Sequence, residues 1–122
     1  MKNIILATLT VMVAALFAPA ADAQEIKGGN VTMVVYKSPE TGKDVQINMD
    51  PDNHKKWYER APDGTHVFNA AMRDEWSVYL WDAKRGVAMQ IDLFKKKITY
   101  GFGGPNGIVT RASGAYAITH AQ

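Results

Sequence analysis

Aromatic and polar side chains recur two residues apart in the middle of the chain. They are Tyr79, Trp81, Gln90 and Asp92. Alternate residues of a β-strand point to the same face of the sheet, so each pair would share one face of its strand. Aromatic rings cover the C–H surface of a flat polar molecule such as a sugar, while an amide or a carboxylate bonds its hydroxyls. The spacing therefore suggests a binding module with an exposed aromatic face for carbohydrate or another polar ligand, with Trp57 and Tyr58 at its edge.

Two other uses of the same aromatic face stay open from the sequence. A terminal segment of the chain or a second subunit would cover these rings in an ordinary packed structure. In a closed barrel, the same alternation could instead face a lumen that holds a small apolar or mixed ligand.

No catalytic signature accompanies these residues. The candidate carboxylates are Glu59, Asp63, Asp74, Glu75, Asp82 and Asp92. A glycosidase needs two carboxylates at a defined separation, and no spacing in the sequence sets such a pair. The serines lack a Gly-x-Ser-x-Gly elbow. We therefore expect a protein that is not an enzyme, with a small hydrolase built on a carboxylate or on His66 as an alternative.

Metal and cofactor sites are also not expected. The three histidines, His54, His66 and His120, have no metal-ligand spacing. The Asp50–His54 turn alternates oxygen ligands as calcium loops do, but Lys55 and Ala61 stand where an EF-hand needs glycine and glutamate. We interpret it as a proline turn closed by Asx hydrogen bonds.

The charge distribution favours neither nucleic acid nor any other polyanion as a partner. The net charge is only +2, and the densest basic run, Lys95–Lys97, is typical of a solvated hairpin tip. A protein partner is a further alternative. An inhibitor of an exported enzyme would present a protruding loop such as Ser38–Asp44 or Gly103–Gly107.

The elements that must position these residues are predicted to be strands. Runs rich in β-branched and aromatic residues alternate with turns that contain glycine, proline, asparagine or aspartate, as in small sandwiches and barrels. The expected strands are Val31–Lys37, Val45–Met49, Lys55–Arg60, Thr65–Ala70, Trp76–Trp81, Val87–Phe94, Lys97–Phe102 and Ile108–Thr119, the last interrupted near Ser113. The sequence thus predicts an all-β antiparallel barrel or sandwich of about seven or eight strands.

Two details complete this prediction. Apolar residues alternate with smaller or polar ones on two successive predicted strands, and the apolar set should face the core. This predicted inner face consists of Val87, Met89, Ile91 and Leu93 on the first strand and Ile98, Tyr100 and Phe102 on the second. The segment Asn69–Glu75 has a helical bias and is expected to form one helical turn or a loop.

The N-terminus predicts export. Lys2 precedes an apolar run over Ile4–Ala18, which is shorter than the about 20 residues of a membrane-spanning helix, so no stable membrane span is expected. Pro19 ends the run, and Ala21–Ala23 offers a small-x-small cleavage site. We therefore expect a signal peptide over residues 1–23 and a single periplasmic or secreted β domain over residues 24–122. With no cysteine, this domain has no disulfides and depends on burial alone.

Overall fold

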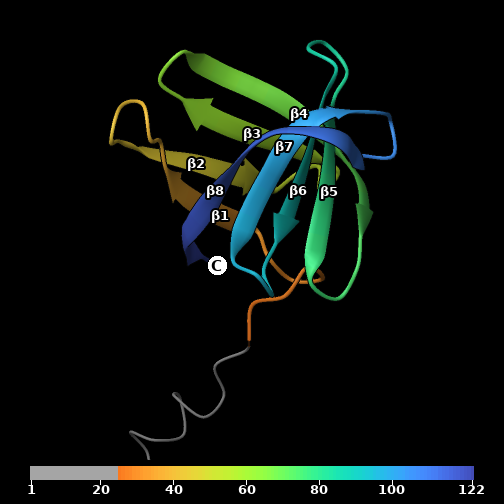
Figure 1. Cartoon of the computed structure of the whole chain (residues 1–122). Coiled ribbons are helices and arrows are strands. Elements are labelled where there is room, and N and C mark those ends of the chain that lie inside the picture. Colours follow the sequence, from red (N-terminus) through yellow and green to blue (C-terminus); the bar gives the residue numbers. More distant parts are fainter. Residues whose placement is uncertain (1–24) are drawn as a thin grey trace, which may run out of the picture.

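The computed structural model describes residues 25–122, which form one closed antiparallel β-barrel (Figure 1). The predicted signal peptide lies outside the described residues. The strands are β1 (Met33–Lys37), β2 (Asp44–Met49), β3 (Lys56–Ala61), β4 (Gly64–Arg73), β5 (Ser77–Asp82), β6 (Val87–Asp92), β7 (Lys97–Gly103) and β8 (Val109–Ala121).

The topology is a simple meander. Each strand pairs with the next one in sequence, and β8 returns to pair with β1, which closes the ring. The prediction of an all-β antiparallel fold is confirmed, and of the two predicted architectures the chain adopts the barrel. Residues 25–122 contain no helix, and among them no helical segment is long and apolar enough to cross a membrane.

The interior is built from alternate residues of the strands. The buried apolar side chains include Val34, Ile47, Trp57, Phe68, Val78, Leu80, Met89, Ile91 and Ile98. The predicted inward set on β6 is thus confirmed for Met89 and Ile91. An eight-stranded barrel is just wide enough for such side chains to fill it. The core therefore occupies the barrel lumen itself.

The two ends of the barrel differ. We call the end that carries the β2–β3, β4–β5 and β6–β7 loops the closed end, and the opposite end the mouth (Figure 1). At the closed end the segment 27–31 crosses the lumen and buries Val31 completely. Arg73 secures this segment, because its side chain donates hydrogen bonds to the carbonyls of Gly28 and Val31. This segment covers part of the closed end, and a second hollow lined by Ile26, Trp76, Leu93 and Ile118 remains beside it.

Three predicted details change. The segment Asn69–Glu75 is not a helical turn, because β4 continues to Arg73 and pairs with β5 through a bulge between Ala70 and Met72. The expected interruption of the last strand is a bulge at Ser113 within a continuous β8. Phe102 follows the inward alternation of β7, but it lies at the mouth and stays 58% exposed.

Gly28 gives a direct test of the closing segment. A Cβ on Gly28 would lie 2.4 Å from the carbonyl oxygen of Asp74, whereas a Cβ on Gly29 would meet nothing within 4 Å. Because the obstructing atoms are backbone, Gly28→Ala should lower the free energy of unfolding by about 1–3 kcal/mol. Gly29→Ala, the matched control, should stay within about 0.5 kcal/mol of the wild type. Guanidinium unfolding of both variants checks this, and equal stabilities would show that the segment does not close the barrel.

Candidate functional site

A cavity of about 300 Å³ opens at the barrel mouth. Its walls come from the inner faces of β1, β2, β3, β4, β6, β7 and β8, and its rim from the β1–β2, β3–β4 and β5–β6 connections. Ser38, Glu40 and Thr41 belong to the first of these connections, and Pro62 and Asp63 to the second. Barrel mouths are common positions for small-molecule sites, and the volume falls at the lower end of the ~300–1,000 Å³ typical of them.

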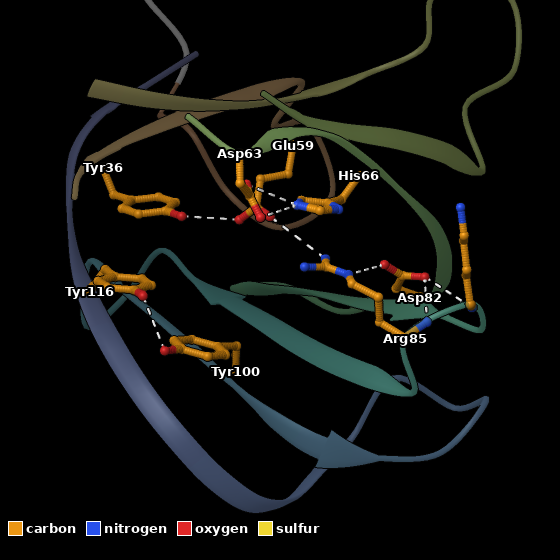
Figure 2. A network of polar contacts seen from close by, with 9 residues as sticks. Tyr36, Glu59, Asp63, His66, Asp82, Arg85, Tyr100 and Tyr116 are labelled. Carbon is orange, nitrogen blue, oxygen red and sulfur yellow. Dashed lines mark hydrogen bonds and ion pairs between the residues drawn. The ribbon is translucent and has the colours of Figure 1, made fainter. Parts of the chain in front are cut away.

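Three tyrosines form one wall of the cavity (Figure 2). The ring of Tyr116 stacks on Tyr36 at a centroid distance of 4.4 Å and on Tyr100 at 5.2 Å, with the planes within 11° of parallel. The Tyr116 hydroxyl donates a hydrogen bond to the Tyr100 hydroxyl at 3.1 Å. Closure of β8 between β1 and β7 brings these rings together, and the result is a rigid aromatic wall with polar tips.

Two buried carboxylates and a partly exposed arginine lie across the cavity from the tyrosines (Figure 2). Glu59 on β3 and Asp82 at the end of β5 are only 6% and 3% exposed. Arg85 lies between them: its Nε donates to Asp82 Oδ2, and its Nη2 is 3.7 Å from Glu59 Oε1. The Tyr36 hydroxyl donates to Glu59 Oε2 at 3.0 Å, which joins the tyrosine wall to the charged wall. We call Glu59, Asp82 and Arg85 the charge network.

Local hydrogen bonds explain how Arg85 reaches into the barrel from a loop. Asp82 Oδ1 accepts hydrogen bonds from the backbone N–H groups of Lys84 and Arg85, and these bonds hold the β5–β6 connection in a tight turn. Gly86 takes a positive φ of 68°, which suits glycine, and completes the turn. The guanidinium then packs 5.4 Å from the centroid of the buried Phe68 ring. Arg85 is thereby fixed before any ligand arrives.

His66 and Asp63 form a second polar pair at the rim. His66 on β4 lies directly opposite Glu59 in the strand register, and its Nε2 is 3.1 Å from Asp63 Oδ1. The hydrogen bond with His66 lowers the pKa of the Asp63 carboxyl. Within residues 25–122, no three His, Asp or Glu side chains are close enough to hold a metal ion.

The residues singled out from the sequence lie elsewhere. Tyr79, Trp81, Gln90 and Asp92 are half-buried and share the outer face of β5 and β6, as their alternation implies. Tyr79 and Gln90 are opposite each other in the register. Their polar groups are already engaged, since the Tyr79 hydroxyl donates to Asp74 and the Gln90 amide donates to Ser77. The structure therefore brings these residues together, with part of their hydrogen-bonding capacity used.

The β7–β8 loop lies against this outer face. A Cβ on Gly107 would be 3.0 Å from the Tyr79 Cβ, and one on Gly103 would be 2.5 Å from the Ala88 Cβ. Ala88, an outward residue of β6, is consequently fully buried. On β3, Trp57 points into the core and is also fully buried, so that only Tyr58 of this pair remains on the outer surface.

The sequence contained a usable signal for the mouth cavity. Glu59 follows Trp57 at the inward spacing of β3, and Asp82 follows Leu80 at the inward spacing of β5. Two carboxylates at core positions indicate an interior that needs a cation, because a buried charge is costly unless paired. The tyrosines gave no comparable signal, since Tyr36 and Tyr116 are far apart in sequence and meet only when the barrel closes.

Tyr36 makes the charged mouth testable by alkaline titration. Burial, and next the charge of Glu59, raise the pKa of Tyr36 well above the ordinary value of 10.0. Below about pH 10 the folded and unfolded states both keep this proton, whereas at higher pH the unfolded state releases it first, so stability falls as pH rises. Tyr36→Phe should cost about 1 kcal/mol at pH 7 through the lost hydrogen bond, and this deficit should shrink above pH 10. Urea unfolding of the wild type and Tyr36→Phe at pH 7 and above pH 10 checks this. A stability difference between the two proteins that stays the same at both pH values would contradict the raised pKa of Tyr36.

Comparison with protein-family models, with curated proteins and with solved structures finds no match to this chain. The function is therefore argued from the geometry of the barrel and of its mouth cavity.

Proposed function

We propose that this chain is a non-catalytic binding module that takes a small polar ligand into the mouth cavity. The observation that carries this proposal is the cavity of about 300 Å³, with stacked tyrosines on one side and the charge network on the other. Such a combination of apolar surface and a few fixed polar groups is typical of small-molecule sites.

The two walls of the cavity would contact different parts of the ligand. The stacked rings of Tyr36, Tyr100 and Tyr116 supply flat apolar surface, and their hydroxyls supply hydrogen bonds at its edge. Glu59 and Arg85 supply an acceptor and a donor that are already oriented by each other. Little side-chain freedom is lost on binding when the partners are held in place beforehand, and this favours affinity.

The mouth cavity is a better site than the outer aromatic face. Both places combine aromatic rings with polar groups, but only the mouth encloses the ligand from several sides. On the outer face, the β7–β8 loop packs against Tyr79 through Gly107, and the hydroxyl of Tyr79 and the amide of Gln90 already have partners. The predicted role in binding is therefore kept, while the proposed site moves inside the barrel.

Export belongs to the same proposal. The apolar run before Pro19 and the Ala21–Ala23 cleavage site favour a mature domain that begins at Gln24 and works in the periplasm or outside the cell. A cysteine-free barrel does not depend on the redox state of that compartment.

A small hydrolase is the second candidate, because His66 pairs with Asp63 at the rim of a cavity that Ser38 also lines. A histidine that contacts a carboxylate is one part of a nucleophilic site. Turnover of chromogenic esters and glycosides that is lost in His66→Ala would favour this candidate, and the binding module has no turnover to lose.

The position of the site can be tested with two variants. Ala61→Trp places a large side chain at the rim of the cavity, and Trp81→Ala removes the central ring of the outer face. Two-dimensional NMR titration with a panel of small sugars, amino acids and amines should shift residues around Tyr36 and Tyr116. Ala61→Trp should weaken binding at least tenfold, while Trp81→Ala should leave it within about twofold, since a filled cavity excludes ligand. Shifts centred on Tyr79 and Trp81, with the opposite pattern of losses, would place the site on the outer face.

Expression of the full chain in a bacterial host tests export. The protein recovered from the periplasm should begin at Gln24, as N-terminal sequencing or intact mass would show, because signal peptidase cuts after the small-x-small motif. Ala23→Leu should block this cut, because a large side chain does not fit the position before the cleaved bond. A full-length protein that remains in the cytoplasm would contradict the assignment.

A further inference from the structure

The charges around the mouth cavity are unbalanced, and this points to the class of ligand, provided that the proposed binding function holds. Glu40, Glu59 and Asp63 line the cavity, and Asp82 lies directly behind Arg85. Among the described residues of the lining, Arg85 is the permanent cation that opposes these carboxylates. Even when His66 is counted as a second cation, the four carboxylates leave the site with an excess of negative charge.

The imbalance extends into the buried part of the site. Glu59 and Asp82 are almost completely shielded from water, and they share the single guanidinium of Arg85. The Tyr36 hydroxyl adds a hydrogen bond to Glu59 but no charge. Water screens a buried charge poorly, so an incoming positive group would gain more here than at the protein surface.

The opposite wall also favours a cation. The stacked rings of Tyr36, Tyr116 and Tyr100 cover one another's faces, so their hydroxyls form the polar part of this wall. The Tyr36 hydroxyl donates to Glu59 and the Tyr116 hydroxyl to Tyr100, which leaves lone pairs of the hydroxyl oxygens as acceptors. A positive nitrogen between the two walls would be close to a carboxylate and to these oxygens at once.

We propose that the ligand of the mouth cavity is a small organic cation, an alkylammonium compound whose positive nitrogen lies between Glu59 and the tyrosine wall. An anion fits poorly, because Arg85 is already engaged by Asp82 and Glu59. A metal ion fits poorly too, since no three ligating side chains converge within residues 25–122 and aromatic rings are not metal ligands. The volume of about 300 Å³ suits a molecule with few carbon atoms.

The test compares probes that differ mainly in charge. Choline and 3,3-dimethyl-1-butanol have nearly the same shape, but only choline carries a positive charge. Putrescine, glucose and butyrate represent primary amines, neutral sugars and anions. NMR or calorimetric titration of the purified protein should give a Kd for choline or putrescine at least tenfold lower than for the neutral isostere. The affinity should also fall as salt is added, because salt screens the exposed carboxylates of the rim.

Three variants assign the effect to the cavity. Glu59→Gln should weaken cation binding at least tenfold and leave binding of the neutral isostere nearly unchanged. Glu40→Gln changes an exposed rim residue, which keeps the test valid if Glu59→Gln unfolds, and should weaken cation binding about two- to fivefold. Asp92→Asn, on the outer face of β6, is the matched control and should stay within twofold.

The outcomes separate this inference from the proposed function. If glucose, butyrate or the neutral isostere binds in the cavity as tightly as the cations do, the proposed ligand class is wrong. The proposed binding function would then still hold. Equal losses in Glu40→Gln and Asp92→Asn would also overturn it, since the charge of the cavity would then not matter. If no probe of any charge binds, both the ligand class and the binding function fail.

Discussion

The volume inside an eight-stranded barrel must be filled by side chains or left to a ligand, and this constraint governs the whole molecule. Away from the mouth, apolar residues such as Trp57, Phe68 and Leu80 are fully buried and pack the lumen. Toward the mouth, charged and aromatic side chains replace them, and these groups hold one another against the walls. Arg85 is central to this arrangement, because without it Glu59 and Asp82 would be buried carboxylates without a compensating cation. The space that remains between the walls is the candidate site.

Most of the fold follows from local patterns in the sequence. The two-residue alternation from Val87 to Leu93 predicts both the strand and its inner face, and turn residues mark nearly every connection. The choice between barrel and sandwich depends on the pairing of β8 with β1, which no local pattern encodes. At the segment after Asn69 the local pattern was misleading. Its weak helical preference is overridden because the segment pairs with β5 as part of β4.

The candidate site was harder to predict than the fold. Alternation correctly groups Tyr79 with Trp81, but it does not reveal that the β7–β8 loop packs against their face. Alternation also assigns Tyr100 to the core and gives no sign that its ring lines a cavity, because a tyrosine at an inward position is compatible with simple packing. Carboxylates such as Glu59 at inward positions were the more informative observation, since a core rarely accepts a charge without a purpose or a partner.

The closing ladder also determines when the barrel can fold. Seven of the eight ladders join strands that are neighbours in sequence, whereas the backbone N–H groups of Thr32 and Met33 donate to the carbonyl of Gln122. Contacts between such distant residues form late and slow the folding of a chain. Until Gln122 has left the ribosome, β1 and β7 remain open edges that invite wrong pairing. The barrel therefore closes only after its last strand has been synthesised, whichever compartment it folds in.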